Sequence, residues 1–215
     1  MSKHPLIIAL EGPCLAGKTT MIERLRTTFE SAGWSVFCVP EYTVYAGGHK
    51  NLPDLYPKND LAAKNNAEFL VDLENERLKD VQAWTVEHYG TRESVVLVDR
   101  LLFSCLFVQR RTGDKVGYDV LLQAAKSRRM IVPHLTVFLR ISASAEEYES
   151  RLSTRKLFSN WEVIYSPVGY EEFFINIYQE ILSASPKCYD SVSIDRIIAD
   201  VYQKALEVIR NGSTH

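Results

Sequence analysis

Residues 6–20 read LIIALEGPCLAGKTT, and this stretch decides the fold. The apolar run at residues 6–10 predicts a buried strand, and the residues after Lys18 have the apolar spacing of a helix. Between them the sequence matches G-x-x-x-x-G-K-[ST] at every fixed position. Glycines of this pattern let backbone N–H groups surround an anion at a helix N-terminus, and its lysine reaches the β- and γ-phosphates of a nucleotide. We therefore predict a loop that binds a nucleoside triphosphate and consists of Gly12, Pro13, Cys14, Leu15, Ala16, Gly17, Lys18, Thr19 and Thr20.

A second apolar run, residues 95–98, ends directly before Asp99 and Arg100. The carboxyl ends of parallel strands meet at one edge of a sheet, so this carboxylate is expected beside the phosphate-binding loop. Asp99 and the hydroxyl of Thr19 are the predicted ligands of a Mg²⁺ ion. Arg100 brings a second cation, besides Lys18, toward phosphates that are being transferred. The pattern predicts a Mg-ATP site in which Lys18, Asp99 and Arg100 have catalytic roles.

Short strand-like runs followed by helical patterns recur along the chain. Strands are predicted at residues 6–10, 35–39, 95–98, 135–139 and 191–194. The runs are mostly continuous in apolar residues, as in strands that are buried on both faces of a parallel sheet. We predict an α/β fold of the P-loop NTPase type, with three α/β/α layers around a five-stranded parallel sheet.

Two segments interrupt this alternation within one predicted domain, residues 1–215. About residues 42–90 are predicted to form a helical substrate-binding insert, in which a long loop precedes a helix over about 60–89. On that helix Phe69 and Trp84 are expected in the core. About residues 151–167 form a further irregular segment that is basic at its start and rich in aromatic residues. Arg151 and Arg155 lie four apart there and share a helix face, where they either stabilise transferred charge or form a solvated basic helix end.

Composition and charge exclude several classes of protein. Hydrophobic residues make up 46% of the 215-residue chain, which excludes a disordered protein. The formal net charge of -2 gives no electrostatic footprint for nucleic acid or a membrane surface. No apolar run approaches the roughly 18 residues of a membrane span. Four scattered cysteines without metal-ligand spacing favour a reduced compartment, so a cytoplasmic location is expected.

With these motifs placed, the sequence resembles thymidylate kinases and the related deoxyribonucleoside kinases over nearly its whole length. Residues 11–20 are similar to the E-G-x-x-x-x-G-K-T-T opening of thymidylate kinases. Asp99 and Arg100, followed by Ser104 and Gln109, are similar to their D-R helix. The resemblance implies phosphoryl transfer from ATP with Mg²⁺ and an association into homodimers. It also implies a lid over about residues 151–167 that carries Arg151 and Arg155.

The acceptor side departs from the thymidylate kinase pattern. Cys14 stands where that family usually has an acidic residue, and Tyr42 stands where it has an arginine that grips the acceptor phosphate. Arg77 falls near a family arginine on the long helix, so a monophosphate acceptor is less favoured but stays open. Residues 39–41, Val-Pro-Glu, are similar to the V-P-E-P of deoxyribonucleoside kinases, where the glutamate is the general base. The resemblance thus implies acceptor-binding roles for Glu41 and Arg77, with Glu41 also catalytic. Tyr42, an aromatic residue on a loop directly after Glu41, and Arg100, which follows the strand beside the loop, are further candidates for acceptor binding.

These observations predict an ATP-dependent phosphotransferase that moves the γ-phosphoryl group to a nucleoside or a nucleoside monophosphate. One alternative keeps the chemistry and changes the acceptor to another small alcohol, such as an antibiotic or a sugar. A less favoured alternative is a nucleotide switch without catalysis. The sequence leaves open the identity of the acceptor, its base and the oligomeric state.

Overall fold

The structure, a computed structural model, describes residues 4–90, 93–141, 148, 150, 153, 169–190 and 193–212. Within these ranges no helix is both long enough and apolar enough to cross a lipid bilayer. The elements follow in the order β1 (Leu6–Glu11), α1 (Lys18–Ser31), β2 (Ser35–Val39), α2 (Tyr42–Tyr45), the 3₁₀ turn η1 (His49–Asn51), α3 (Asp60–His88), β3 (Ser94–Asp99), α4 (Leu102–Thr112), α5 (Lys115–Lys126), β4 (Leu135–Arg140), α8 (Tyr170–Leu182), β5 (Lys187–Asp190) and α9 (Ile194–Gly212).

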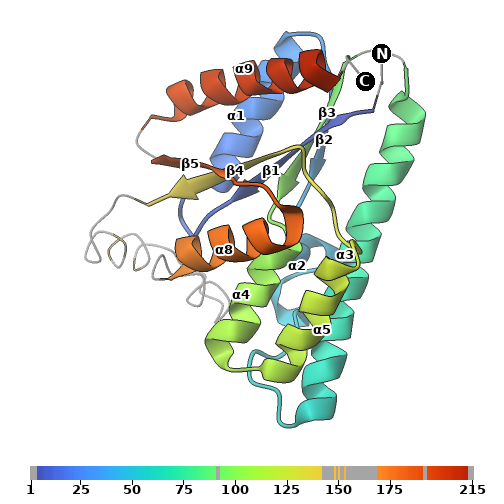
Figure 1. Ribbon diagram of the computed structural model, residues 1–215, viewed down its shortest axis with the longest axis vertical. Helices are drawn as coiled ribbons and strands as arrows, with labels where there is room; N and C mark the ends of the chain where they lie inside the picture. The colour runs from blue at the N-terminus through green and yellow to red at the C-terminus, as the bar shows by residue number, and fades with distance from the viewer. Residues whose placement is uncertain are drawn as a thin grey trace.

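The five strands form one parallel sheet in the order β2-β3-β1-β4-β5. Helices α1 and α9 cover one face, and α3, α4, α5 and α8 lie on the other side (Figure 1). Each face has its own buried cluster, because strands β1, β3 and β4 present apolar side chains in both directions. The predicted three-layer α/β/α fold with a five-stranded parallel sheet is confirmed.

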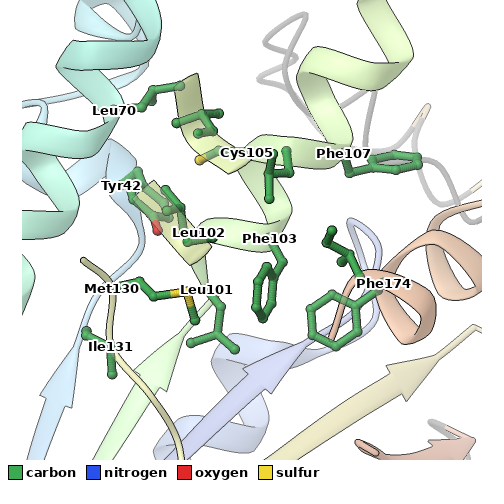
Figure 2. Packing of buried hydrophobic residues seen from close by; sticks show 14 of the residues in the cluster. Tyr42, Leu70, Leu101, Leu102, Phe103, Cys105, Phe107, Met130, Ile131 and Phe174 are labelled. Carbon is green, nitrogen blue, oxygen red and sulfur yellow. The ribbon is translucent and has the colours of Figure 1, made fainter. Parts of the chain in front are cut away.

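The core on the α4 side combines aliphatic side chains with a group of aromatic rings, and it lies close to strands of the sheet (Figure 2). Phe103 of α4 and Phe174 of α8 meet edge to face with ring centroids 5.9 Å apart. Tyr42, Leu70 and Cys105, from α2, α3 and α4, gather at one end of the same cluster. This end of the core therefore borders the edge of the sheet where a ligand is expected.

The strand register brings separate motifs to that edge. Leu10 of β1 pairs with Asp99 of β3, so Asp99 lies beside the start of the phosphate-binding loop. Val39 of β2 pairs with Val98 of β3, so Glu41 follows its strand next to Asp99 and Arg100. The three segments meet because parallel strands end on the same side of the sheet.

Four strands lie where the sequence predicts them, but the fifth prediction, residues 191–194, was wrong. The strand is Lys187–Asp190, and Ile194 begins α9. β5 is an edge strand that pairs only with β4, and its Cys188 and Tyr189 are half-buried. It lacks the continuous apolar run of an interior strand, whereas Ile194 belongs to the apolar face of a helix.

The predicted long helix is confirmed as α3. Asn59 caps its start, because the Asn59 Oδ1 accepts a hydrogen bond from the Ala62 N–H at 2.9 Å. Trp84 packs as expected and stacks on Phe37, with centroids 5.6 Å apart. Phe69, also expected in the core, is 38% exposed. The reason is helical phase, because the buried stripe of α3 follows Ala63, Ala67, Leu70, Glu74, Arg77 and Val81.

His134 extends the pairing of β1 and β4 through its side chain. Its Nδ1 accepts a hydrogen bond from the Ile7 N–H at 3.0 Å, and its backbone N–H donates to the Ile7 carbonyl at 2.8 Å. Burial and the neighbouring His4 lower the pKa of His134. Nδ1 accepts this hydrogen bond only in the unprotonated ring, so protonation is unfavourable in the folded state.

We predict that the wild-type protein loses stability relative to His134→Asn as the pH falls below about 6.5. In the unfolded chain His134 takes up a proton at its ordinary pKa, whereas in the folded protein it does so only at lower pH. The side-chain oxygen of Asn offers an acceptor for the same hydrogen bond and does not titrate. The ring is partly exposed, so the loss is at most about 1 kcal/mol. Urea unfolding of both proteins at about pH 7.5 and about pH 5.5 measures it; an equal difference at both values contradicts the prediction.

Candidate active site

The loop between β1 and α1 has the backbone conformation that its glycines allow. Gly12 has φ +139° and Gly17 has φ +83°. A Cβ atom on Gly12 would lie 2.4 Å from the Leu139 carbonyl oxygen, so the loop passes directly against the end of β4. Gly17 caps α1 without a side-chain hydrogen bond, which leaves the first N–H groups of the helix for a ligand. This is the geometry of an anion-binding loop.

Lys18 lies folded beneath this loop. Its Nζ donates hydrogen bonds to the carbonyls of Gly12 at 3.1 Å and Pro13 at 2.9 Å, and the residue is 8% exposed. Burial, together with the nearby charge of Arg100, lowers the pKa of Lys18 to about 8. An anionic phosphate in the loop counters both effects and favours the charged ammonium.

Gly12→Ala is expected to weaken nucleotide binding at least about 100-fold, or about 2.8 kcal/mol. An alanine must adopt an unfavourable positive φ and place Cβ against the Leu139 carbonyl, which displaces the loop. Gly33→Ala is the matched control, because Gly33 also has φ +87° but has open space around its Cβ, at the far end of α1. Titration calorimetry with ATP tests both variants, and wild-type affinity in Gly12→Ala would show that the loop tolerates a side chain.

A cavity of about 310 Å³ opens beside the loop at the edge of the sheet. It brings together the loop and the predicted residues that follow β2 and β3, since Lys18 and Thr19 share it with Glu41, Asp99 and Arg100. Gly12, Pro13 and Ala16 contribute backbone to the loop and do not line the cavity. The lining residues are Cys14, Leu15, Gly17, Lys18, Thr19, Thr20, Glu41, Tyr42, Thr43, His49, Leu52, Leu70, Asp99, Arg100 and Cys105.

Asp99 and Thr19 fit the predicted metal site. Asp99 is 9% exposed at the end of β3, and its Oδ1 has no hydrogen-bond partner among the described residues. Burial raises the pKa of this carboxyl, while Lys18 and Arg100 oppose the rise. A buried carboxylate oxygen with free acceptor capacity and a nearby hydroxyl are the donors that Mg²⁺ takes alongside substrate phosphates.

Arg100 occupies a strained backbone position at the edge of the cavity. Its φ is +65°, a value that is uncommon outside glycine. Its N–H donates to the Leu10 carbonyl at 3.0 Å, and its Nη1 donates to the Gly12 carbonyl at 3.1 Å. Its Nε lies 3.6 Å from Oε2 of Glu41. The guanidinium thus connects the phosphate-binding loop to the predicted base.

Glu41 faces the cavity with a side chain that is 38% exposed. Its Oε1 accepts a hydrogen bond from the Thr43 hydroxyl at 2.7 Å. Burial favours the neutral acid, but Arg100, the Thr43 hydroxyl, Lys18 and His49 outweigh it and hold the pKa of Glu41 below its ordinary value. Glu41 is therefore a carboxylate at neutral pH and able to accept a proton.

Glu11 is a site residue to which the sequence assigns no role beyond the loop motif. It is fully buried, and its carboxylate accepts hydrogen bonds from the Leu101 N–H at 2.6 Å, the Ser104 hydroxyl at 2.9 Å and the Tyr170 hydroxyl at 2.8 Å. These contacts fix the start of α4 and of α8 to the end of β1. A charged residue that ends an apolar strand is the signal that points to it.

Arg77 is placed differently from its predicted acceptor-binding role, whereas Tyr42 borders the cavity. Tyr42 lines the cavity, yet its hydroxyl donates to Glu74 at 2.8 Å. Arg77 is 0% exposed and does not line the cavity. Its guanidinium donates to Glu74 and to backbone carbonyls of the strand ends. Helix α3 directs the side chain of Arg77 away from the cavity. Sequence spacing alone does not reveal this direction.

The predicted lid arginines, Arg151 and Arg155, lie outside the described residues, so their role stays a prediction. His49, Leu52, Leu70 and Cys105 also line the cavity, and no motif marks them. They come from η1, the loop after it, α3 and α4, and only the folded chain brings these segments together.

No protein-family model and no curated protein matches this sequence. Among solved structures, the thymidylate kinase of Candida albicans aligns with a TM-score of 0.59 and 16% identity, over 99% of this chain and 94% of that one. The deoxyadenosine kinase of M. mycoides aligns with a TM-score of 0.59 and 16% identity, over 94% of this chain and 100% of that one. The chain has the fold of these kinases. The resemblance that residues 11–20 and the Asp99–Arg100 pair suggested is thus confirmed at the level of fold.

Proposed function

We propose that this protein transfers the γ-phosphoryl group of Mg-ATP to a hydroxyl group of a nucleoside. The observation that carries the proposal is the Glu41–Arg100 pair, with Oε2 and Nε 3.6 Å apart, in the cavity that also contains Lys18 and Thr19. A carboxylate base and an arginine beside a phosphate-binding loop suit an alcohol acceptor, whose proton must leave as the phosphoryl group arrives.

The charges around the cavity favour a nucleoside over a nucleoside monophosphate. Among the described lining residues the cationic or titratable basic ones are Lys18, Arg100 and His49. Lys18 lies under the donor loop, and Arg100 faces Glu41. An acceptor phosphate near Glu41 would meet a like charge. Within the described part of the chain it would also find no bidentate arginine of its own, since Arg77 donates to other partners.

The remaining wall of the cavity suits a flat ring. Tyr42, Leu52, Leu70 and Cys105 supply an apolar surface, and Thr43 and His49 supply polar groups. Such a surface packs against a nucleobase, while the sugar hydroxyl extends toward Glu41. The two similar structures are a thymidylate kinase and a deoxyadenosine kinase, and the latter is described with the products dCMP and dCDP bound. Both names support an acceptor of the nucleoside or nucleotide class.

The residues have separate roles in the proposed reaction. The N–H groups of the loop and Lys18 bind the donor phosphates, and Asp99 and Thr19 would hold Mg²⁺, which neutralises phosphate charge. Glu41 accepts the proton of the attacking hydroxyl, while Arg100 stabilises charge on the transferred group. Arg151 and Arg155 are the further candidates for charge stabilisation. The products are ADP and a nucleoside monophosphate.

Coupled measurement of ADP release, with Mg-ATP and matched sets of deoxyribonucleosides and their 5′-monophosphates, tests the proposal. We expect kcat/KM for the best nucleoside to exceed that for its monophosphate at least about tenfold, or about 1.4 kcal/mol of transition-state stabilisation. Preference for the monophosphates contradicts the charge argument. If ATP binds but neither set is phosphorylated, the result favours another alcohol acceptor, such as a sugar or an antibiotic, over a nucleoside.

A further inference from the structure

We infer that the Glu74–Arg77 ion pair of α3 positions Glu41, Asp99 and Arg100 for catalysis. The inference rests on the proposed function, because it concerns the geometry of the same site. Neither Glu74 nor Arg77 lines the cavity, so each acts through other residues. Arg77 therefore has a positioning role in place of the acceptor-binding role that the sequence suggested.

The pair is completely buried and internally satisfied. Nη1 of Arg77 donates to Oε2 of Glu74 at 2.7 Å, and both side chains are 0% exposed. Oε2 of Glu74 also accepts from the Tyr42 hydroxyl, and Oε1 accepts from the Ile131 N–H, each at 2.8 Å. A buried ion pair of this kind gives little net stability relative to an apolar pair, so stability alone does not account for it.

The guanidinium joins the strand ends where the sheet ladder stops. Strands β2 and β3 pair up to Val39 and Val98. One residue further, Nε of Arg77 donates to the Pro40 carbonyl at 3.2 Å and Nη2 donates to the Asp99 carbonyl at 2.8 Å. Arg77 thereby ties the residue before the predicted base to the predicted metal ligand.

The same guanidinium holds the strained residue of the site. Nη2 of Arg77 also donates to the Arg100 carbonyl at 2.8 Å. Arg100 has φ +65°, and a non-glycine residue keeps such a conformation only where its surroundings fix it. Without this hydrogen bond, Arg100 loses one of the contacts that fix its backbone, and its side chain is held less firmly beside Glu41.

The pair also holds the segment that follows Glu41. The Tyr42 hydroxyl donates to Glu74, and Cζ of Arg77 lies 4.3 Å from the centre of the Tyr42 ring. The planar fork of arginine makes these contacts and the carbonyl contacts together, whereas the single ammonium group of lysine cannot. The arrangement therefore requires arginine at position 77 and a carboxylate at position 74.

The test compares Arg77→Lys with Val81→Ala, which removes buried apolar atoms from the same helix without touching the site. Well below the unfolding transition, we expect Arg77→Lys to lower kcat at least about tenfold and to leave the Kd for ADP within about twofold. Val81→Ala is expected to lose stability and keep its kcat. If Arg77→Lys does not fold, Glu74→Gln is measured in its place, with the same direction expected.

A second readout does not depend on activity. In Arg77→Lys, hydrogen exchange in peptides that cover residues 40–44 and 99–104 is expected to accelerate at least about tenfold relative to Val81→Ala. Equal exchange and equal kcat in the two variants would overturn the positioning role. A wild-type protein that phosphorylates no nucleoside contradicts the proposed function, and the exchange comparison then still decides whether the pair fixes these segments.

Discussion

Lys18→Met is expected to reduce turnover by about 10²–10³-fold or more while the protein stays folded. The ammonium lies within the loop, bound to the Gly12 and Pro13 carbonyls, and is the cation best placed for the β- and γ-phosphates. Burial already lowers the pKa of Lys18 to about 8, so the charge is costly in the absence of an anion. An apolar side chain of similar length removes that cost, and the thermal midpoint is expected to stay the same or to rise.

Lys126→Met is the control for this substitution. Lys126 is exposed on α5, its Nζ lies 3.0 Å from Oε1 of Glu180, and it does not line the cavity. Turnover in this control is expected to equal that of the wild type. Single-turnover measurements with saturating acceptor separate a lost chemical step from weaker ATP binding. Retained turnover in Lys18→Met would remove the loop lysine from the mechanism.

Glu41→Gln is expected to lower kcat by about 10²–10⁴-fold, the range for the loss of a general base. The amide keeps the size of the side chain and its contact with Thr43, but it cannot accept the proton of the acceptor hydroxyl. Affinity for ATP is expected to be unchanged or higher, because a negative charge near the phosphates is removed. A loss confined to kcat thus distinguishes a base from a residue that binds ATP.

Glu87→Gln, on the exposed end of α3, is the matched control and should behave as the wild type. Rapid-quench measurement of the chemical step, combined with calorimetry for ATP, gives both quantities. An unchanged chemical step in Glu41→Gln would show that Glu41 is not the base. Weaker ATP binding with unchanged chemistry would place it in the donor site instead.

The part of the site that is local in sequence was predictable. The loop at residues 12–19 is one continuous motif between a strand and a helix, and Asp99 ends an apolar strand, so neither depends on distant contacts. The placement of Asp99 beside the loop followed from one general rule, that parallel strands end at the same edge, and the same rule explains why Glu41 lies near Asp99 and Arg100. The resemblance to kinases supplied the role of Glu41.

The parts that depend on tertiary contacts were not predictable. The role of Arg77 depends on the direction in which α3 presents it, and its partners at Pro40, Asp99 and Arg100 are distant in sequence. Edge strand β5 lacks an apolar run, so the sequence pattern placed the fifth strand at residues 191–194 and missed the actual strand, Lys187–Asp190. Phe69 has the large apolar side chain of a core residue, but it lies outside the buried stripe of its helix.

Transfer of label from γ-labelled ATP to a mixture of deoxyribonucleosides, with the products separated by chromatography, tests the central claim most directly. We expect labelled nucleoside 5′-monophosphate with the wild-type protein and Mg²⁺, and almost none with Glu41→Gln. Labelled diphosphate from a parallel mixture of monophosphates, with no label in the nucleosides, would contradict it. That result would mean that a cation other than Arg100 binds the acceptor phosphate.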